Sequence, residues 1–239
     1  ELEFALENGV HINADSFAEM ERIDNIIEKT GFKSTIGVRI NPQTGSGKIL
    51  ATSVAGEYSK FGIPIKEYRT EIIDSFHKYS WLTGIHLHVG SQGCEMTMLL
   101  DGISSILELV EEINVSLKRA NIKKRIRIFD MGGGLPVSYH YGEIPVSMEE
   151  YKNALYARFE RLFSDEFRLI TEFGRYVHAN TGFTASRVEY VKMDRTINTA
   201  MIHVGADMFL RKCYRPDEWH HDITIVDKYG NIKTSGNAR

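Results

Sequence analysis

A regular alternation of short apolar strands with amphipathic helices is the feature that most constrains the fold of this chain. Strand-like runs lie near residues 10, 36, 85, 128 and 170, and apolar stripes at helical spacing lie within residues 2–8, 17–27, 66–78, 96–120 and 148–163. Strands that are separated by helices pair in parallel, so the pattern predicts an α/β fold. Five such strands cannot close an eight-stranded barrel by themselves.

The pattern changes after residue 178. Runs rich in Val, Ile, Thr and Tyr replace the helical stripes at residues 185–193, 200–204 and 223–226, and residues 228–231 have the composition of a hairpin turn. We therefore expect a barrel domain over residues 1–178 and the beginning of a β domain over residues 179–239. Since neither domain would be complete, we expect the chain to be the middle of a longer protein, without its first barrel strands and its last β strands.

The charge balance argues against several classes of partner. The net charge is −3 with both signs mixed along 239 residues, so there is no basic stripe for nucleic acid. No apolar run approaches the ~18 residues that would span a membrane. The two cysteines, Cys94 and Cys213, have neither metal-ligand spacing nor the density of a disulfide scaffold. The sequence therefore predicts a cytoplasmic protein whose partner is a small molecule.

Residues 84–92 combine one apolar face with one that carries functional side chains. His86 and His88 alternate with three apolar residues, so both histidines lie on one face of the expected strand. In a parallel barrel the apolar face packs on the helices, and the carboxyl end of the strand delivers side chains to a site at the mouth. The histidines therefore point inward, beside a turn containing Ser91 that can bind an anion.

Other strand ends carry further candidates. Alternation along residues 35–41 places Arg39 inward. Three glycines at 132–134 directly follow the strand expected near residue 128. Such a run allows close approach to an anion, commonly a phosphate, although a flexible turn is an equally good interpretation. Glu172 and Arg175 end a later strand, either as a site that uses both charges or as a simple ion pair. The long loop 43–60 either lines the mouth or is a solvated excursion.

Seven short motifs follow one another along nearly the whole chain. They are Asn13-Ala14-Asp15-Ser16, Arg39-Ile40-Asn41-Pro42, Ser59-Lys60-Phe61-Gly62-Ile63, His86-Leu87-His88-Val89-Gly90-Ser91-Gln92, Asp130-Met131-Gly132-Gly133-Gly134-Leu135-Pro136, Glu172-Phe173-Gly174-Arg175 and Arg215-Pro216. In this order they resemble the motifs of the diaminopimelate and ornithine decarboxylase family, and most closely its diaminopimelate branch. These are pyridoxal-phosphate enzymes, so the resemblance implies a partial TIM (β/α)8 barrel of the alanine-racemase type followed by a β domain.

The resemblance also implies roles for individual residues. His88 would stack on the pyridine ring of pyridoxal 5'-phosphate, and Glu172 would hydrogen-bond the pyridine nitrogen, which makes both of them catalytic. The remaining residues that would bind the cofactor are Ser91, Gly133, Gly134, Gly174, Arg175 and Arg39. Those that would bind the substrate, a diaminopimelate-like or basic amino acid, are Arg175, Arg215 and Trp219, the last in place of a tyrosine usual in the diaminopimelate enzymes.

The resemblance leaves two alternatives to an amino-acid decarboxylase. The family's Schiff-base lysine has no counterpart here, because Lys48 lies in a loop and Lys60 belongs to the Lys-Phe-Gly motif. One alternative is thus a non-catalytic homologue with a binding or regulatory role. The other is a metal-dependent barrel hydrolase, since His-x-His can bind zinc. Later strand ends show no matching ligands, so we expect no metal. A homodimer is expected from the resemblance.

Overall fold

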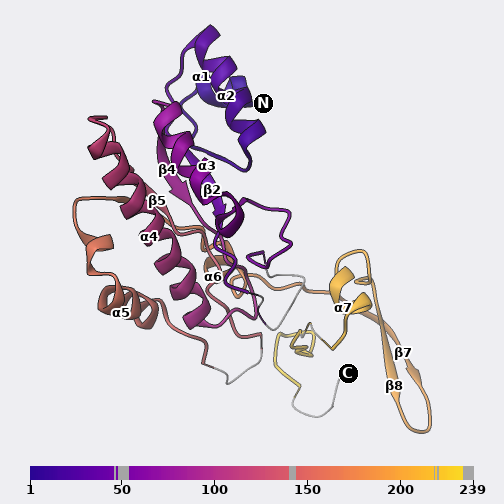
Figure 1. Cartoon of the computed structure of the whole chain (residues 1–239). Coiled ribbons are helices and arrows are strands. Elements are labelled where there is room, and N and C mark those ends of the chain that lie inside the picture. The colour runs from indigo at the N-terminus through magenta and orange to yellow at the C-terminus, as the bar shows by residue number, and fades with distance from the viewer. Residues whose placement is uncertain (46, 48–53, 140–143, 218, 220, 234–239) are drawn as a thin grey trace. The chain divides into compact units, whose positions relative to one another are not determined.

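The computed structural model describes residues 1–45, 47, 54–139, 144–217, 219 and 221–233 (Figure 1). These residues form two compact units. One consists of Glu1–Pro136 and Val146–Val177, and the other of the described parts of Val137–Pro145 and His178–Arg239. The expected division into domains after residue 178 stays a prediction. No helix among the described residues is both long and apolar enough to cross a membrane.

The first unit alternates strands and helices as the sequence predicts. Its elements are α1 (Leu2–Glu7), β1 (Ile12–Ala14), α2 (Phe17–Thr30), β2 (Ile36–Asn41), β3 (Ile63–Pro64), α3 (Ile65–Lys78), β4 (Leu82–His86), α4 (Met96–Arg119), β5 (Ile128–Asp130), α5 (Met148–Arg158), a 3-10 helix (Glu160–Phe163), β6 (Arg168–Ile170) and α6 (Gly174–His178). The strands pair in the order β1-β2-β4-β5-β6, all in parallel, with β3 beside the end of β2. The α/β class with a parallel sheet is confirmed.

Helix α4 covers the apolar side of β4 and its extension. Its buried stripe repeats at helical spacing and includes Ile103, Ile106 and Val110. A Cβ at Gly102 of this helix would lie 2.6 Å from the side chain of Val89 and 3.3 Å from that of Leu87. The helix therefore lies against the face of residues 84–89 that the sequence predicts to be apolar. Figure 1 shows α4 running alongside these strands.

Several local expectations were wrong. The strand expected to reach residue 89 ends at His86, and the helix expected over 148–163 breaks at Phe159 into α5 and the 3-10 helix. The two-residue strand β3 and the short helix α6 have no counterpart in the expectations. All four are short or terminal pieces, whose form depends on tertiary contacts more than on local pattern.

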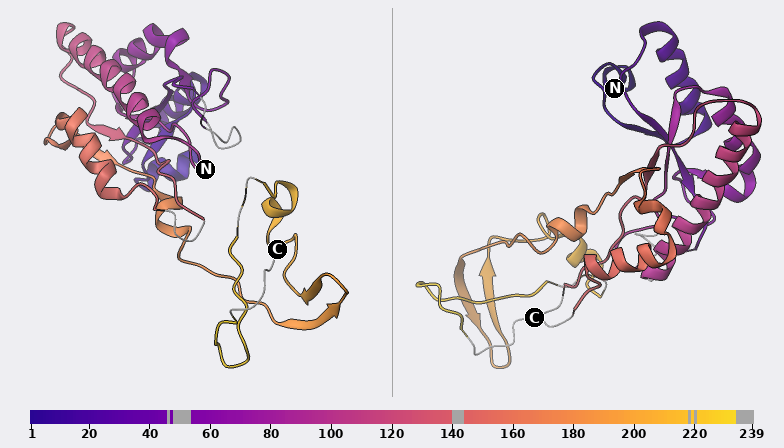
Figure 2. Two further views of the ribbon diagram at one scale, coloured as in Figure 1. Left: turned by 90° about the horizontal axis from the view of Figure 1, so that it is seen from below. Right: turned by 90° about the vertical axis from the view of Figure 1, so that its left-hand side faces the viewer.

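The second unit contains an antiparallel hairpin of β7 (Val188–Met193) and β8 (Asn198–Ile202), visible in Figure 2, and a short helix α7 (Leu210–Tyr214) that the sequence did not predict. The expected strand at 223–226 is reduced to a bridge between Val226 and Ile232. Between these two residues the chain turns with Gly230 at φ 87°, which agrees with the predicted hairpin turn.

Candidate functional site

One row of paired residues carries polar side chains across three neighbouring strands. Arg39 of β2 pairs with His86 of β4, and His86 pairs with Asp130 of β5. Residues paired in this way point to the same face of a sheet. His86 and Asp130 are both buried. The three polar groups therefore lie side by side near the carboxyl ends of their strands.

The row of paired residues two positions earlier in the strands contains two glycines. Because they have no side chains, the side chain of a residue on β1 can reach across the face of the sheet. Asn13 of β1 pairs with Gly37, and Gly37 pairs with Gly84. A Cβ at Gly37 would lie 2.5 Å from Asn13 Oδ1. In the space left by this missing Cβ, Asn13 Nδ2 donates to Asp130 Oδ2 at 2.9 Å, while the other oxygen of Asp130 accepts the backbone N–H of Gly132 at 3.0 Å. This link joins β1 to β5 across two intervening strands.

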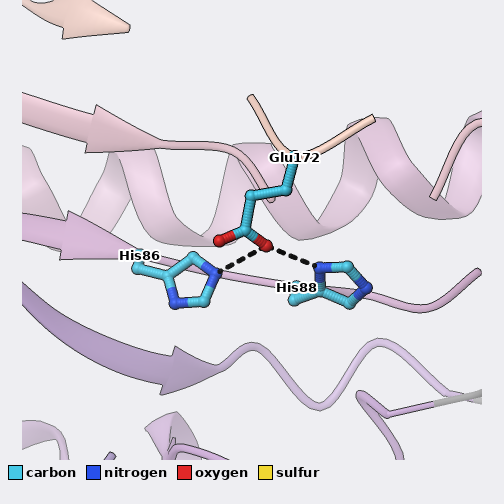
Figure 3. A group of neighbouring side chains, drawn as sticks. All are labelled: His86, His88 and Glu172. Carbon is cyan, nitrogen blue, oxygen red and sulfur yellow. Dashed lines mark hydrogen bonds and ion pairs between the residues drawn. The ribbon is translucent and has the colours of Figure 1, made fainter. Parts of the chain in front are cut away.

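His86, His88 and Glu172 meet at the end of this row (Figure 3). Glu172 Oε2 lies 3.3 Å from His88 Nδ1 and 3.7 Å from His86 Nε2. The pKa of the Glu172 carboxyl is lowered from its ordinary value, chiefly by its interactions with His86 and then with His88, against an opposing effect of burial. The carboxyl group is therefore ionised at neutral pH. Both histidine rings are turned toward Glu172.

Each glycine of the run 132–134 has a packing reason to lack a side chain. A Cβ at any of the three would come within 3.0 Å of a backbone carbonyl oxygen, that of Leu87, Glu172 or Gly90 respectively. Two of their N–H groups have partners within the chain, because Gly132 donates to Asp130 and Gly133 donates to His88 Nδ1 at 3.2 Å. The glycines thus fit the ends of neighbouring strands tightly. The phosphate-binding role of Gly133 and Gly134 stays a prediction.

Ser91 and Arg175, two of the predicted phosphate ligands, are brought together. Arg175 Nε donates to Ser91 Oγ at 2.9 Å, although the two residues come from different strand ends. Arg175 lies in the first turn of α6, directly after Gly174, whose N–H donates to the carbonyl of Glu172 at 2.8 Å. A guanidinium and a hydroxyl group at one place suit a bound anion.

Arg39 is held between an aromatic ring and acidic groups. Its guanidinium lies 4.6 Å from the ring centre of Phe61, and its Nε lies 3.9 Å from Asp15 Oδ1. Burial lowers the pKa of Arg39, and the charges of Asp15, Glu172 and Asp130 oppose that shift. The side chain therefore adds positive charge close to the histidines and Glu172.

Some predicted site residues are not placed relative to these groups. Arg215 and Trp219 belong to the second unit, so their contact with a substrate stays a prediction. Residues 46 and 48–53 of the loop 43–60, with Lys48, lie outside the described residues. The described end of this loop passes near the site, because Val54 N–H donates to the carbonyl of Val89 at 3.2 Å.

Asn13 and Asp130 organise the site but are not among the predicted site residues. The sequence carried one signal for Asp130, a carboxylate that ends an otherwise apolar strand directly before the glycine run. A charge in such a position is costly to bury unless it has partners. The partner, Asn13, is more than a hundred positions away; it belongs to one of the seven motifs, but nothing in that motif indicated a contact with Asp130.

Comparisons with known proteins show which family the chain resembles. The sequence profile of the family described as "Pyridoxal-dependent decarboxylase, pyridoxal binding domain" matches residues 1–179. Diaminopimelate decarboxylase of Vibrio cholerae serotype O1 is 30% identical over 224 residues, which are 93% of this chain and 51% of that protein. The same enzyme of Helicobacter pylori strain J99 is 30% identical over 240 residues, 98% of this chain and 56% of that protein.

A solved structure is also similar. The crystal structure of diaminopimelate decarboxylase from Helicobacter pylori complexed with L-lysine matches with a TM-score of 0.78 and 26% identity, over 95% of this chain and 55% of that one. The chain thus spans about half the length of the relatives it matches. The family that the seven motifs resemble is confirmed, and so is the pyridoxal cofactor of that family.

Proposed function

The chain belongs to the pyridoxal-dependent decarboxylase family, and on this premise we propose that it forms the cofactor site of an enzyme that removes carbon dioxide from a diaminopimelate-like or basic amino acid. One observation carries the proposal. An ionised carboxylate, Glu172, faces the ring of His88 from a different strand end. This is the pairing that a protonated pyridine ring requires, a flat group to lie against and an acceptor for its N–H.

The donors around Glu172 fit pyridoxal phosphate. Ser91 and Arg175, already in contact at 2.9 Å, supply a hydroxyl and a guanidinium for the phosphate. Gly133 and Gly134 are proposed to contact the phosphate through their backbone, as the family's glycine-rich motif implies. Arg39 contributes a further positive charge.

The chain's residues divide the work as follows. Glu172 holds a proton on the pyridine nitrogen, because a carboxylate stabilises the charged form of its partner. His88 supports the ring face, and Ser91 with Arg175 fixes the phosphate end, so the ring cannot turn. When bound, pyridoxal phosphate supplies a conjugated ring that withdraws electrons as carbon dioxide leaves. Arg175, Arg215 and Trp219 are proposed to bind the substrate, the arginines through its carboxylates.

The proposal includes the whole protein's setting. We place the active form in the cytoplasm and as a homodimer. The Schiff-base lysine would come from a part of the protein outside residues 1–239. A full-length protein without that lysine would be the non-catalytic homologue instead.

Cofactor binding by the chain tests the first part. Equilibrium dialysis against pyridoxal phosphate and against pyridoxal should give tighter binding of the phosphate form. Arg175→Met should weaken binding of pyridoxal phosphate about tenfold to a hundredfold, because a charge-assisted hydrogen bond is lost, and should leave pyridoxal unaffected. Glu172→Gln should weaken the binding of both pyridoxal phosphate and pyridoxal. Glu112→Gln, a surface residue of α4 paired with Arg69, is the matched control.

Activity of the full-length protein tests the second part. With pyridoxal phosphate and diaminopimelate, it should release carbon dioxide, and a panel of basic amino acids identifies the preferred substrate. No release from any amino acid by cofactor-loaded protein would contradict the decarboxylase assignment. Equal binding of pyridoxal phosphate by the wild type, Arg175→Met and Glu172→Gln would contradict the site.

A further inference from the structure

We infer that the cofactor-free chain binds one zinc-class divalent ion between His86, His88 and Glu172. Only the sharing of His88 and Glu172 with the cofactor rests on the proposed function, and it makes ion and cofactor mutually exclusive. The sequence predicted no metal, because it showed no further ligands at later strand ends. The structure supplies a third ligand from a residue that the sequence assigned to another role, Glu172.

The spacing of the three groups suits one small ion. One ligand atom from each residue lies within 4.8 Å of the others. Glu172 Oε2 is 3.3 Å from His88 Nδ1 and 3.7 Å from His86 Nε2, and both rings point to this oxygen in Figure 3. Ligand atoms of a tetrahedral zinc site, with bonds of ~2.0–2.1 Å, lie roughly 3.3 Å apart. Small side-chain movements therefore complete the site.

His86 is buried and close to Glu172, but among the described residues its ring nitrogens have no hydrogen-bond partner. Its side chain is only 6% exposed, and neither ring nitrogen makes a hydrogen bond to any described residue. A buried polar atom without a partner costs free energy, and native structures contain few of them. An ion that coordinates Nε2 would satisfy a buried nitrogen that now makes no hydrogen bond.

His88 Nδ1 is in contact with one group that needs a hydrogen-bond acceptor and with another that needs a donor. The N–H of Gly133 donates to it at 3.2 Å, while the carboxylate of Glu172 lies at 3.3 Å. A single ring nitrogen cannot both accept the N–H and donate to the carboxylate. When it accepts, two acceptors face each other, and a cation between them removes that repulsion. The ion displaces the Gly133 hydrogen bond from the nitrogen.

The ligand set selects the kind of ion. Two imidazoles and one carboxylate are the nitrogen and oxygen donors of zinc and cobalt sites, whereas magnesium and calcium prefer oxygen ligands alone. Glu172 is 44% exposed, so an ion can enter from solvent and keep a water molecule as its fourth ligand.

Metal titration tests the inference without cofactor. The purified chain, stripped of metal and cofactor, is titrated with Co²⁺, whose visible absorption reports coordination, and then with Zn²⁺ as competitor. One equivalent should bind. His86→Gln and Glu172→Gln should lose affinity by more than the roughly 10–100-fold that removal of an outer hydrogen-bond partner costs. His77→Gln is the matched control, since His77 lies on α3 and contacts Ser116.

Unchanged affinity in both His86→Gln and Glu172→Gln would overturn the inference, as would the absence of binding by the wild type. Because His86 is buried, its variant is compared with the wild type by thermal unfolding, and Glu172→Gln decides if His86→Gln does not fold. Adding pyridoxal phosphate should release the zinc. Zinc retained beside bound cofactor would place the ion elsewhere and also overturn the inference. If no cofactor binds, the proposed function fails, and the titration alone decides on the metal.

Discussion

At the scale of single residues, Gly133 shows why a glycine can be required without contacting a ligand. An added Cβ would lie against the carbonyl oxygen of Glu172, in a backbone that cannot shift without moving Glu172 itself. Gly174, predicted to serve the same phosphate, has no atom within 4 Å of such a Cβ. The two glycines are therefore a matched pair for separating packing from ligand binding.

Gly133→Ala should lower the free energy of unfolding by about 1–3 kcal/mol, because the new methyl group overpacks against backbone. Gly174→Ala should change it by no more than ~0.5 kcal/mol, since the methyl group meets open space. Urea denaturation monitored by circular dichroism measures both. Equal stability of the two variants would show that the contact at Gly133 relaxes freely.

Sequence alone could predict single residues wherever a periodicity was local. The two-residue period of a strand predicted His86 and His88 on one face, and the motif Glu172-Phe173-Gly174-Arg175 singled out Glu172. It could not predict that Arg39, His86 and Asp130 form one row, because the register between strands is set by packing of segments that are far apart in the chain.

At the scale of elements, Asp130 joins the first strand of the sheet to the fourth strand in its order. Its two oxygens accept from Asn13 of β1 and from the N–H of Gly132, which starts the turn after β5. Both donors act on a carboxylate that is 2% exposed. The position of the glycine turn therefore depends on a strand at the other side of the sheet.

Asp130→Asn should destabilise the fold by about 1–3 kcal/mol, because one of the two N–H donors then faces another donor. Asn13→Asp in the same chain should recover part of that loss, since donor and acceptor are exchanged between the two positions. A double-mutant cycle by chemical denaturation measures the coupling. Additive losses would mean that the two side chains do not interact in solution.

The longest helix and the shortest elements mark the limits of prediction, although the three-residue strands β1, β5 and β6 were expected. The long apolar stripe of α4 was recognised almost to its last residue, whereas β3 and α7, of two and five residues, were not predicted. Short elements bury too little periodic surface to leave a pattern, and the contacts that form them come from elsewhere in the chain.

At the scale of the whole molecule, the pH dependence of stability should reveal the ionisation of one partly buried lysine. Lys124 follows α4, donates to the carbonyl of Tyr79 and lies 5.9 Å from the ring centre of Phe76. Burial lowers its pKa to about 8. No pattern in the sequence distinguishes this residue from the rest of the 29 lysines and arginines.

Lys124 should contribute a rise in stability as the pH increases from about 8 to 10, because the unfolded chain still holds a proton that folded Lys124 has released. Burial raises the pKa of Cys94, which opposes part of this rise. Burial raises the pKa of Tyr151 to about 12, which opposes this trend only above about pH 10. Lys124→Met should remove the rise, and Lys123→Met, at an exposed neighbour, should keep it. Urea midpoints measured from pH 7 to 10 check both; an unchanged slope in Lys124→Met contradicts the assignment.

The all-parallel pairing also affects how the chain folds while it is being synthesised. Ile36 pairs with Leu82, and Ile128 pairs with Arg168, so each strand must wait for a partner that leaves the ribosome much later. At the usual rate of synthesis, β2 remains without β4 for roughly 2–8 s. Throughout that interval the edge of β2 that pairs with β4 has no strand beside it. Yield should consequently increase when chaperones that hold nascent chains are abundant, and decrease when translation is slowed, because slower synthesis lengthens the interval.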